Sequence, residues 1–493
     1  MTSLIGLLPA AGRGVRAYPY TERIPKSMLA VDGVPVLRRN IELMRDALGI
    51  RDIRIVLGHC GEVIRRSFGD GSALGVDLRY IENPRIDLEL PYSVLLAGRD
   101  IDSHCCMILP DECYVNSNHG DLARSFDPTQ LVTLTTVTSE YKKHIRKNYV
   151  LDTQAGQIVD LIEKPEHVTS RIMGTGTYIL HPDVFRRLEG AYGGDPERGP
   201  RDWTTWLAGL ARSGEKLAAF DLTGKYVNIN SRDDLNYANF LVRDRGFDQR
   251  RTSLVYLIEG EEEAAAGPVA RFAEQPEIDE VVVVTRRLSP ALESVGDADG
   301  VVLVTAPSGA IFSQLVKLGL DRASGDIFLI SYSDDTFAAR DVSKLLVYLR
   351  DADMVVGTRT TRQMIEQGTN MRGIVRAAHV LLAKLMQVLW WRFDSRFTDV
   401  CCVYRAMWRS TYESIRDNLT ATGVEVFPEM VLEVLRARRR IIEIPVNYYN
   451  RDLEFDHVHG RYQTGNTFVR IVWLILRKRI ADSRRLQRLR GGG

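Results

Sequence analysis

The chain has 493 residues, 45% of them hydrophobic, which predicts roughly two or three globular domains with ordinary cores. Lys and Arg number 65 and Asp and Glu 64, so the net charge of +1 gives no electrostatic reason to expect a nucleic-acid partner. The sequence shows no signal peptide, no run of the roughly 20 apolar residues that span a membrane, and no CxxC pair among its six cysteines. These features predict a cytoplasmic protein with free, mostly buried thiols.

Short apolar runs alternate with amphipathic stretches through the first half of the chain. Residues 35–49 are predicted to form a helix, because apolar side chains recur at helical spacing and Gly49 supplies a stop. The predicted strands are residues 4–8, 53–57, 76–81 and 105–110. This alternation is typical of an α/β domain with a mainly parallel sheet.

A glycine-rich turn, AAGRG, follows the first predicted strand. Such a turn directs backbone N–H groups at a ligand, and phosphate is the anion that fits it best. Gly12 and Gly14 give the turn its freedom, Arg16 offers a forked donor, and Lys26 follows Pro25 in a stiffened loop. The sequence therefore predicts a phosphate site here.

From Gly12 to Pro35 the sequence resembles the signature of the sugar-phosphate nucleotidylyltransferases, GxGTRxxPxTxxxPKxLxxVxGxP. Val15, where that family has threonine, is the clear departure. Further similar segments extend the resemblance to about residue 240: residues 68–84, 109–111, 162–165, 174–185 and 226–239.

The resemblance implies that a sugar 1-phosphate attacks the α-phosphate of a nucleoside triphosphate and expels pyrophosphate, with Mg²⁺ (or Mn²⁺) as cofactor. It implies that Ala11, Gly12, Gly14 and Arg16 hold the triphosphate. Lys26 then contacts the reacting phosphates and Asp111 holds the metal. Glu163, Lys164 and Gly176 would bind the sugar phosphate.

Two departures concern the metal and the base. Asn228 stands where the family has a second metal-binding aspartate, and an amide oxygen can ligate Mg²⁺ but brings no charge. Residues 89–97 replace the family's base-contacting segment. This leaves open a cytidylyltransferase that activates phosphocholine, inositol phosphate or a phosphonate.

The charged stretch 243–252 interrupts the alternation and predicts a domain boundary. Predicted strands then resume at residues 253–258, 280–285, 300–305, 326–331 and 354–359, and helices are expected to dominate from about residue 370. The predicted division is residues 1–245, residues 252–480 and a basic tail at 481–493. The predicted fold is two consecutive Rossmann-like (GT-A type) α/β domains with mainly parallel sheets and a C-terminal helical extension.

The sequence of residues 319–346, 355–359, 398–407 and 441–451 resembles the family 2 glycosyltransferases, and most closely their dolichyl-phosphate or polyprenyl-phosphate mannosyltransferase branch. The resemblance implies that Asp334 holds a metal and that Asp399 lies near the acceptor. Arg405 and Arg451 would then contact phosphates. Tyr332 replaces the first aspartate of the metal motif, and TRRLS at 285–289 replaces an acidic segment. A degenerate, scaffolding domain therefore remains the alternative to an active transferase.

The resulting hypothesis is a bifunctional enzyme that makes an activated sugar and transfers it to an acceptor such as polyprenyl phosphate. The amphipathic stretches 374–393 and 468–476, with the basic tail after them, could place the protein at the inner face of a membrane. Ordinary core helices and a solvated tail are the alternative. A homo-oligomer is a further expectation.

Overall fold

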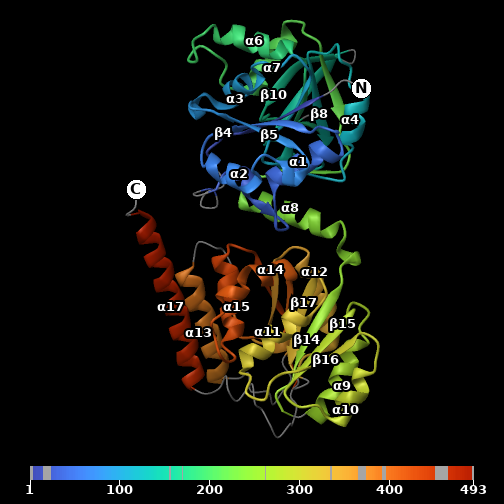
Figure 1. The fold of residues 1–493 in the computed structure, drawn as a ribbon, viewed down its shortest axis with the longest axis vertical. Coiled ribbons are helices and arrows are strands. Elements are labelled where there is room, and N and C mark those ends of the chain that lie inside the picture. The colour runs from blue at the N-terminus through green and yellow to red at the C-terminus, as the bar shows by residue number, and fades with distance from the viewer. Residues whose placement is uncertain are drawn as a thin grey trace. The chain divides into compact units, whose positions relative to one another are not determined.

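The structure is a computed structural model. It describes residues 4–14, 21, 24–154, 157–168, 170–260, 262–332, 336–364, 373–390, 396–449 and 465–490. The chain divides into two compact units, Met1–Val242 and Arg243–Gly493. Each unit is built on its own seven-stranded sheet (Figure 1).

The sheet of the first unit has the order β12-β8-β11-β6-β1-β4-β5. Its strands are β1 (Ile5–Ala10), β4 (Asp52–Leu57), β5 (Asp77–Glu82), β6 (Cys105–Ile108), β8 (Val132–Thr138), β11 (Ile172–Leu180) and β12 (Leu217–Asp221). Neighbouring strands are parallel except at β11, which is antiparallel to both β6 and β8.

Helices cover both faces of this sheet, so its central strands are apolar on both sides. Leu7 and Leu8, neighbours in β1, belong to separate hydrophobic clusters because successive side chains of a strand point to opposite faces. The helices of the unit are α1 (Val36–Asp46), α2 (Gly61–Phe68), α3 (Glu89–Gly98), α4 (His119–Ser125), α5 (Lys142–Ile145), α6 (Asp183–Tyr192) and α7 (Trp203–Arg212).

Smaller elements surround the carboxyl edge of the sheet. The 3-10 helix η2 (Lys26–Met28) follows the glycine-rich turn. Strand β7 (Glu112–Val115) pairs with β13 (Lys225–Asn228), and β9 (Tyr149–Gln154) pairs with β10 (Gln157–Glu163), both antiparallel. Helix α8 (Arg232–Asp244) follows β13.

The sheet of the second unit has the order β16-β15-β14-β17-β19-β18-β20. Its strands are β14 (Thr252–Leu257), β15 (Glu280–Thr285), β16 (Val301–Thr305), β17 (Ile327–Tyr332), β18 (Met354–Thr358), β19 (Arg405–Trp408) and β20 (Ile441–Pro445). Strand β19 is antiparallel to both β17 and β18, and the other neighbours are parallel.

The two units repeat one topology. When the strands of each sheet are numbered in chain order, both sheets have the order 3-2-1-4-6-5-7. In both, the sixth strand is antiparallel to its two neighbours. The predicted fold class, two α/β domains with mainly parallel sheets and a C-terminal helix, is confirmed.

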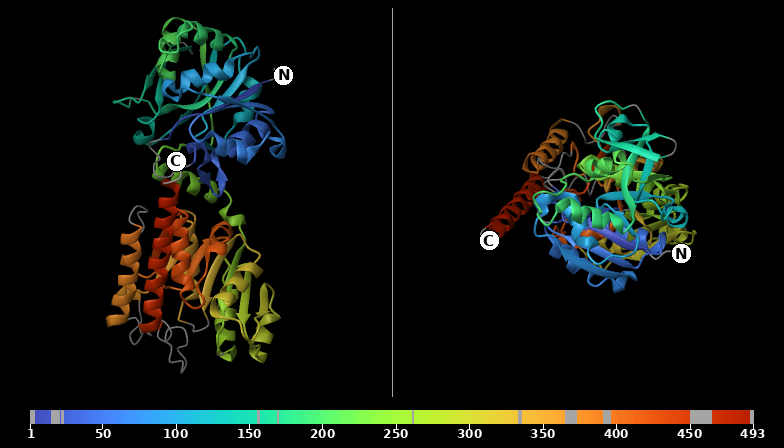
Figure 2. Two further views of the ribbon diagram at one scale, coloured as in Figure 1. Left: turned by 60° about the vertical axis from the view of Figure 1, so that its left-hand side comes forward. Right: turned by 90° about the horizontal axis from the view of Figure 1, so that it is seen from above.

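As the sequence predicted, helices dominate the described residues after about 370, and the two short strands β19 and β20 from this region complete the second sheet. The described helices of this unit are α9 (Glu262–Ala273), α10 (Pro290–Gly296), α11 (Phe312–Arg322), α12 (Val342–Leu349), α13 (Gly373–Leu389), α14 (Arg409–Ile415), α15 (Val426–Arg436) and α17 (Gly465–Arg490). Helices α13 and α17 lie side by side (Figures 1 and 2). Among the described helices, none has the length and apolar character needed to cross a membrane.

Candidate active site

The glycine-rich turn leaves the carboxyl end of β1. Ala11 is buried, and its carbonyl accepts a hydrogen bond from the His59 N–H at 3.2 Å. Gly12 is exposed. Gly14 has φ of +63°, a left-handed conformation that favours glycine, and its carbonyl accepts a bond from Thr21 Oγ1 at 2.8 Å. Arg16 lies outside the described residues.

Lys26 connects this turn to the end of β6. Its ammonium group makes an ion pair with the carboxylate of Asp111 and donates to Asn230 Oδ1 at 2.8 Å. The Asn230 side-chain amide in turn donates to Asn228 Oδ1 at 2.7 Å. The structure thus brings together three predicted site residues, Lys26, Asp111 and Asn228, and adds Asn230, which the sequence prediction missed.

The oxygen atoms of this cluster suit a hard cation. The Asp111 carboxylate and the Asn230 amide oxygen already converge on one cation, the ammonium of Lys26. Carboxylate and amide oxygens are also the ligands that Mg²⁺ takes from proteins, so the donor set fits this metal. Within the described part of the chain, no group of three or more His, Cys, Asp or Glu side chains could hold a metal ion. A metal here would therefore depend on Asp111 and on amide oxygens.

Asp111 is followed directly in the sequence by a buried carboxyl group, Glu112. It accepts hydrogen bonds from Tyr226 at 2.6 Å, from Tyr114 at 2.5 Å and from the Gly176 N–H at 2.8 Å. Burial raises the pKa of Glu112 from 4.5 to about 7, although these hydrogen bonds oppose the rise.

Gly176 is needed at this point of β11 because a Cβ there would lie 2.7 Å from Glu112 Cδ and 2.5 Å from Leu109 Cγ. Its N–H is already bonded to Glu112. The N–H of Gly176 thus helps to hold the Glu112 carboxyl group in place. The contact between Gly176 and the substrate stays a prediction.

Replacing Glu112 with glutamine is expected to change how stability depends on pH. The folded state holds the Glu112 proton more tightly than the unfolded state does. The contribution of Glu112 to the free energy of unfolding is therefore fully present below about pH 4.5 and is lost as pH rises through about 7. The pKa rise corresponds to about 3 kcal/mol of unfolding free energy. Urea denaturation of wild type and Glu112→Gln across this range checks it, and parallel stability curves for the two proteins would contradict it.

Glu163 is the last residue of β10, and Lys164 follows it directly. The Lys164 N–H donates to the Asn148 carbonyl at 2.8 Å, and the Lys164 ammonium pairs with Glu163 at 2.7 Å. The Asn148 side chain accepts weak bonds from Asn228 and from Tyr226, both at 3.4 Å. Asn148 therefore links the Glu163–Lys164 pair to the Lys26 cluster.

A pocket opens beside this link. Its lining includes His144, Lys147, Asn148, Tyr226, Asn228 and Asp234. Lys147 and Asp234 form an ion pair at 2.8 Å, and Asp234 also accepts the Asn230 N–H at 3.1 Å. The pocket thus combines aromatic rings, amides and a neutralised charge pair next to the cluster.

The predicted site residues of the second unit are placed differently. Asp334 and Arg451 lie outside the described residues. Arg405 is fully buried in the core, where its guanidinium donates to the carbonyls of Phe427 at 2.8 Å and of Cys402. These two contacts are with the backbone, and a phosphate contact of Arg405 stays a prediction.

Asp399 is also fully buried. It accepts bonds from Arg359 Nε at 2.8 Å and Nη2 at 3.1 Å, and His379 Nδ1 lies at 3.2 Å. Burial opposes ionisation, but the Arg359 guanidinium and His379 hold the pKa of Asp399 well below its usual range. Asp399 is thus part of an internal ion pair, and its predicted place near an acceptor stays a prediction.

Near the carboxyl ends of β14 and β15, a cation and a carboxylate pair with each other. Arg286 donates to Glu259 at 3.0 Å and to the Ala310 carbonyl at 3.0 and 3.1 Å. Tyr332, in place of the first aspartate of the predicted metal motif, is buried. The charges of Arg286 and Glu259 are therefore paired within the protein.

Comparison with known proteins concerns the first unit. The model of the nucleotidyl transferase family matches residues 5–242. A UTP–glucose-1-phosphate uridylyltransferase of Haloferax volcanii is 28% identical over 230 residues, which are 46% of this chain and 92% of that protein. A low-salt glycan biosynthesis nucleotidyltransferase of the same organism is 30% identical over 256 residues, 50% of this chain and 68% of that protein.

A glucose-1-phosphate thymidylyltransferase of Streptomyces antibioticus is 32% identical over 199 residues, 39% of this chain and 54% of that protein. Among solved structures, a UDP-glucose pyrophosphorylase complexed with UDP-glucose is 22% identical, with a TM-score of 0.43, over 49% of this chain and 99% of that one. Through residues 5–242, this chain belongs to the nucleotidyl transferase family.

Proposed function

We propose that the first unit transfers a nucleotidyl group from a nucleoside triphosphate to a sugar 1-phosphate and releases pyrophosphate. The cluster of Lys26, Asp111 and Asn230 beside the glycine-rich turn carries this proposal, because it sets one cation and one carboxylate next to a turn suited to phosphate. Relatives named for the same reaction on glucose 1-phosphate support it.

The chemistry requires little beyond positioning and charge neutralisation. A phosphate oxygen of the sugar 1-phosphate attacks the α-phosphorus, a new P–O bond forms, and the bond from the α-phosphorus to the oxygen bridging it to the β-phosphorus breaks. The backbone of Ala11, Gly12 and Gly14 would hold the triphosphate. The Lys26 ammonium would neutralise charge on the reacting phosphates, and Glu163 and Lys164 would hold the second substrate.

A divalent cation would complete this site. Asp111, with an amide oxygen of Asn228 or Asn230, would hold Mg²⁺, which supplies charge neutralisation to the triphosphate when bound. With one carboxylate in place of two, we propose that this site binds the metal more weakly than a two-aspartate site does.

Replacing Asn228 with aspartate is expected to lower the Mg²⁺ concentration that gives half-maximal activity. Asn228 Oδ1 already accepts the Asn230 amide, and a carboxylate can keep that bond while adding the missing charge. Magnesium titrations of wild type and Asn228→Asp check the direction, with Asn118→Asp, on a loop of the same unit, as the control. An unchanged or higher magnesium requirement in Asn228→Asp alone would contradict it.

The type of reaction does not specify the nucleotide base or the second substrate. The segment that replaces the family's base-contacting stretch forms α3, and the pocket beside Asn148 has aromatic as well as polar walls. A cytidylyltransferase for phosphocholine, inositol phosphate or a phosphonate is therefore the alternative. Pyrophosphate release from the purified chain, screened over the common triphosphates and a panel of sugar 1-phosphates and these three substrates, decides between them.

For the second unit we propose transfer of the activated product to an acceptor such as polyprenyl phosphate. The strand order repeated from the first unit supports a nucleotide site at the same edge of the sheet. The Arg286–Glu259 pair favours the alternative of a scaffold without transferase activity. Formation of a lipid-linked sugar that is lost in Asp334→Ala supports transfer, whereas no lipid product with wild type supports the scaffold.

A further inference from the structure

One face of helix α17 exposes a row of large apolar side chains. Val469, Trp473, Leu476 and Ile480 are 63%, 60%, 42% and 52% exposed. Their spacing of four, three and four residues puts them on a single face of the helix. An exposed apolar row of this length is unusual for a helix of a globular protein.

Helix α13, which packs beside α17, has a second such row. Ile374, Leu381 and Val388 recur every seven residues and are 86%, 60% and 66% exposed. The two rows, here called the α13–α17 surface, hold half of the large hydrophobic side chains that are exposed in the described part of the chain. The exposure is thus concentrated on one helix pair instead of being scattered.

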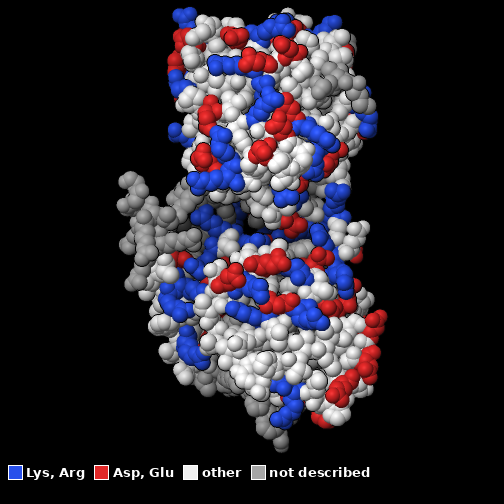
Figure 3. All heavy atoms as spheres, in the orientation of Figure 1, with Lys and Arg blue, Asp and Glu red and all other residues white. Residues whose placement is uncertain are grey.

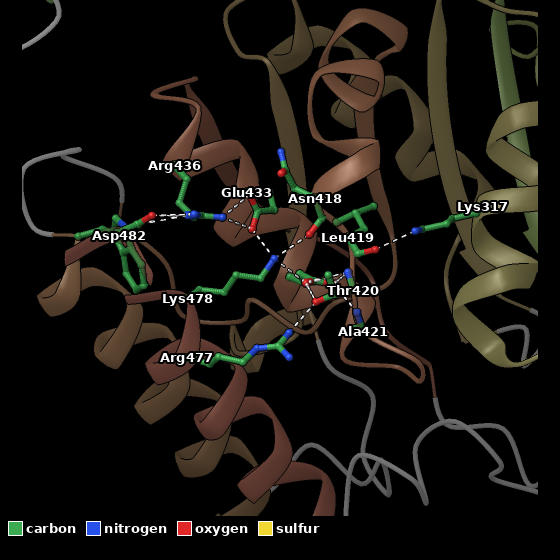
Figure 4. A network of polar contacts seen from close by, with 12 residues as sticks. Lys317, Asn418, Leu419, Thr420, Ala421, Glu433, Arg436, Arg477, Lys478 and Asp482 are labelled. Atoms are coloured by element: carbon green, nitrogen blue, oxygen red, sulfur yellow. Dashed lines mark hydrogen bonds and ion pairs between the residues drawn. The ribbon is translucent and has the colours of Figure 1, made fainter. Parts of the chain in front are cut away.

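The outward direction of the apolar row is fixed by ion pairs on the inner side of α17 (Figure 4). Lys478, almost fully buried, bonds to Glu433 at 2.7 Å and to Glu429 at 2.8 Å. One turn further, Asp482 pairs with Arg436 of α15 at 2.6 Å. Turning the apolar row inward would break these pairs, and loss of the buried ones that Lys478 makes is costly. Helix α17 therefore packs Ile471, Ile475 and Lys478 inward and leaves the apolar row exposed.

Cations accompany the exposed row. Arg477 lies over the Trp473 ring at 5.2 Å, and Arg479 lies over Trp390 at 5.7 Å. The α17 sequence continues with Arg484, Arg485, Arg488 and Arg490. Figure 3 shows Lys and Arg side chains along the side of the second unit that carries α13 and α17. The one acidic residue of α17, Asp482, is already paired with Arg436.

We propose that the α13–α17 surface binds the surface of an anionic lipid bilayer. An apolar row with an indole ring and flanking arginines matches a helix that lies in the interface, with its apolar side at the acyl boundary and its cations on lipid phosphates. A second copy of this chain would cover the apolar rows too, but it would bring like charges together. The proposal does not depend on whether either unit is catalytically active.

Co-sedimentation of the full chain with vesicles tests the proposal. Wild type is expected to bind vesicles of phosphatidylcholine mixed with phosphatidylglycerol more strongly than vesicles of phosphatidylcholine alone, and to release them as salt rises. The double variant Leu381→Ser/Trp473→Ser should bind at least about tenfold more weakly. The matched control is Val347→Ser on α12, where Val347 is 62% exposed, and it should bind like wild type.

A second pair of variants tests the role of charge. Arg477→Gln and Arg479→Gln should each lower binding to the anionic vesicles about fivefold and leave binding to neutral vesicles unchanged. Equal thermal unfolding of all variants would show that the fold is intact. Equal sedimentation of wild type and the Leu381→Ser/Trp473→Ser double variant would overturn the proposal. It would also be overturned by a dimer, seen by light scattering without lipid, that this double variant disperses.

Discussion

Replacing Lys26 with methionine is expected to slow pyrophosphate release about a hundredfold to a thousandfold. The ammonium group contacts Asp111 and Asn230 together, and its side chain is only 13% exposed. A charge held in such a partly desolvated position stabilises a phosphoryl-transfer transition state far more than a solvated lysine does. Methionine keeps most of the side-chain volume and removes the charge, so the loss should appear mainly in kcat.

The matched control is Lys225→Met in the same unit. Lys225 is exposed on β13 and is expected to tolerate the change with activity within about twofold of wild type, as for most surface substitutions. Initial rates at saturating substrates, measured for both variants alongside their thermal unfolding, separate a catalytic loss from a folding defect. Comparable rates for Lys26→Met and Lys225→Met would remove Lys26 from the proposed chemistry.

Replacing Asp399 with alanine is expected to destabilise the second unit by about 3–5 kcal/mol, because it leaves the Arg359 guanidinium without this partner in the core. Asp399 is fully buried and Arg359 is 1% exposed, so solvent screens the pair very little. Urea denaturation, followed by tryptophan fluorescence, measures the loss. Pyrophosphate release by the first unit should persist in the variant.

The double variant Arg359→Met/Asp399→Leu is the informative control. Removing both charges avoids a single buried ion, so this variant should lose less stability than Asp399→Ala despite carrying two changes. If Asp399→Ala unfolded at the same urea concentration as wild type, the structural role assigned to Asp399 would be wrong.

Most strands of both sheets could be predicted from the sequence because buried parallel strands are short, continuous apolar runs. Residues 280–285 are predicted and observed as a strand with the same bounds. Strand β19 could not be found this way, since it has four residues and begins with Arg405. The repeated strand order could not be predicted from the sequence either, because the pairing of strands depends on contacts between residues that are far apart in the chain.

The candidate site shows the same division. The sequence could predict three site residues, Lys26, Asp111 and Asn228, because each lies in a short segment that resembles a segment of a known family. These segments also occur in the same order along the chain. Glu112 and Asn230 were missed, since their roles arise where β13 pairs with β7 and sets Asn228 opposite Glu112. The burial of individual side chains could not be predicted. The sequence shows an arginine at position 405, but not that its side chain lies in the core and donates hydrogen bonds to two backbone carbonyls.

Identification of the reaction products tests the central claim most directly. Phosphorus NMR of the purified chain with Mg²⁺, a nucleoside triphosphate and the sugar 1-phosphate selected by the screen should show inorganic pyrophosphate. In equal amount it should show a new diphosphate linking the nucleoside to the sugar, and neither product should form when one substrate is left out. Release of inorganic phosphate in place of pyrophosphate, or pyrophosphate without the linked product, would contradict nucleotidyl transfer by this chain.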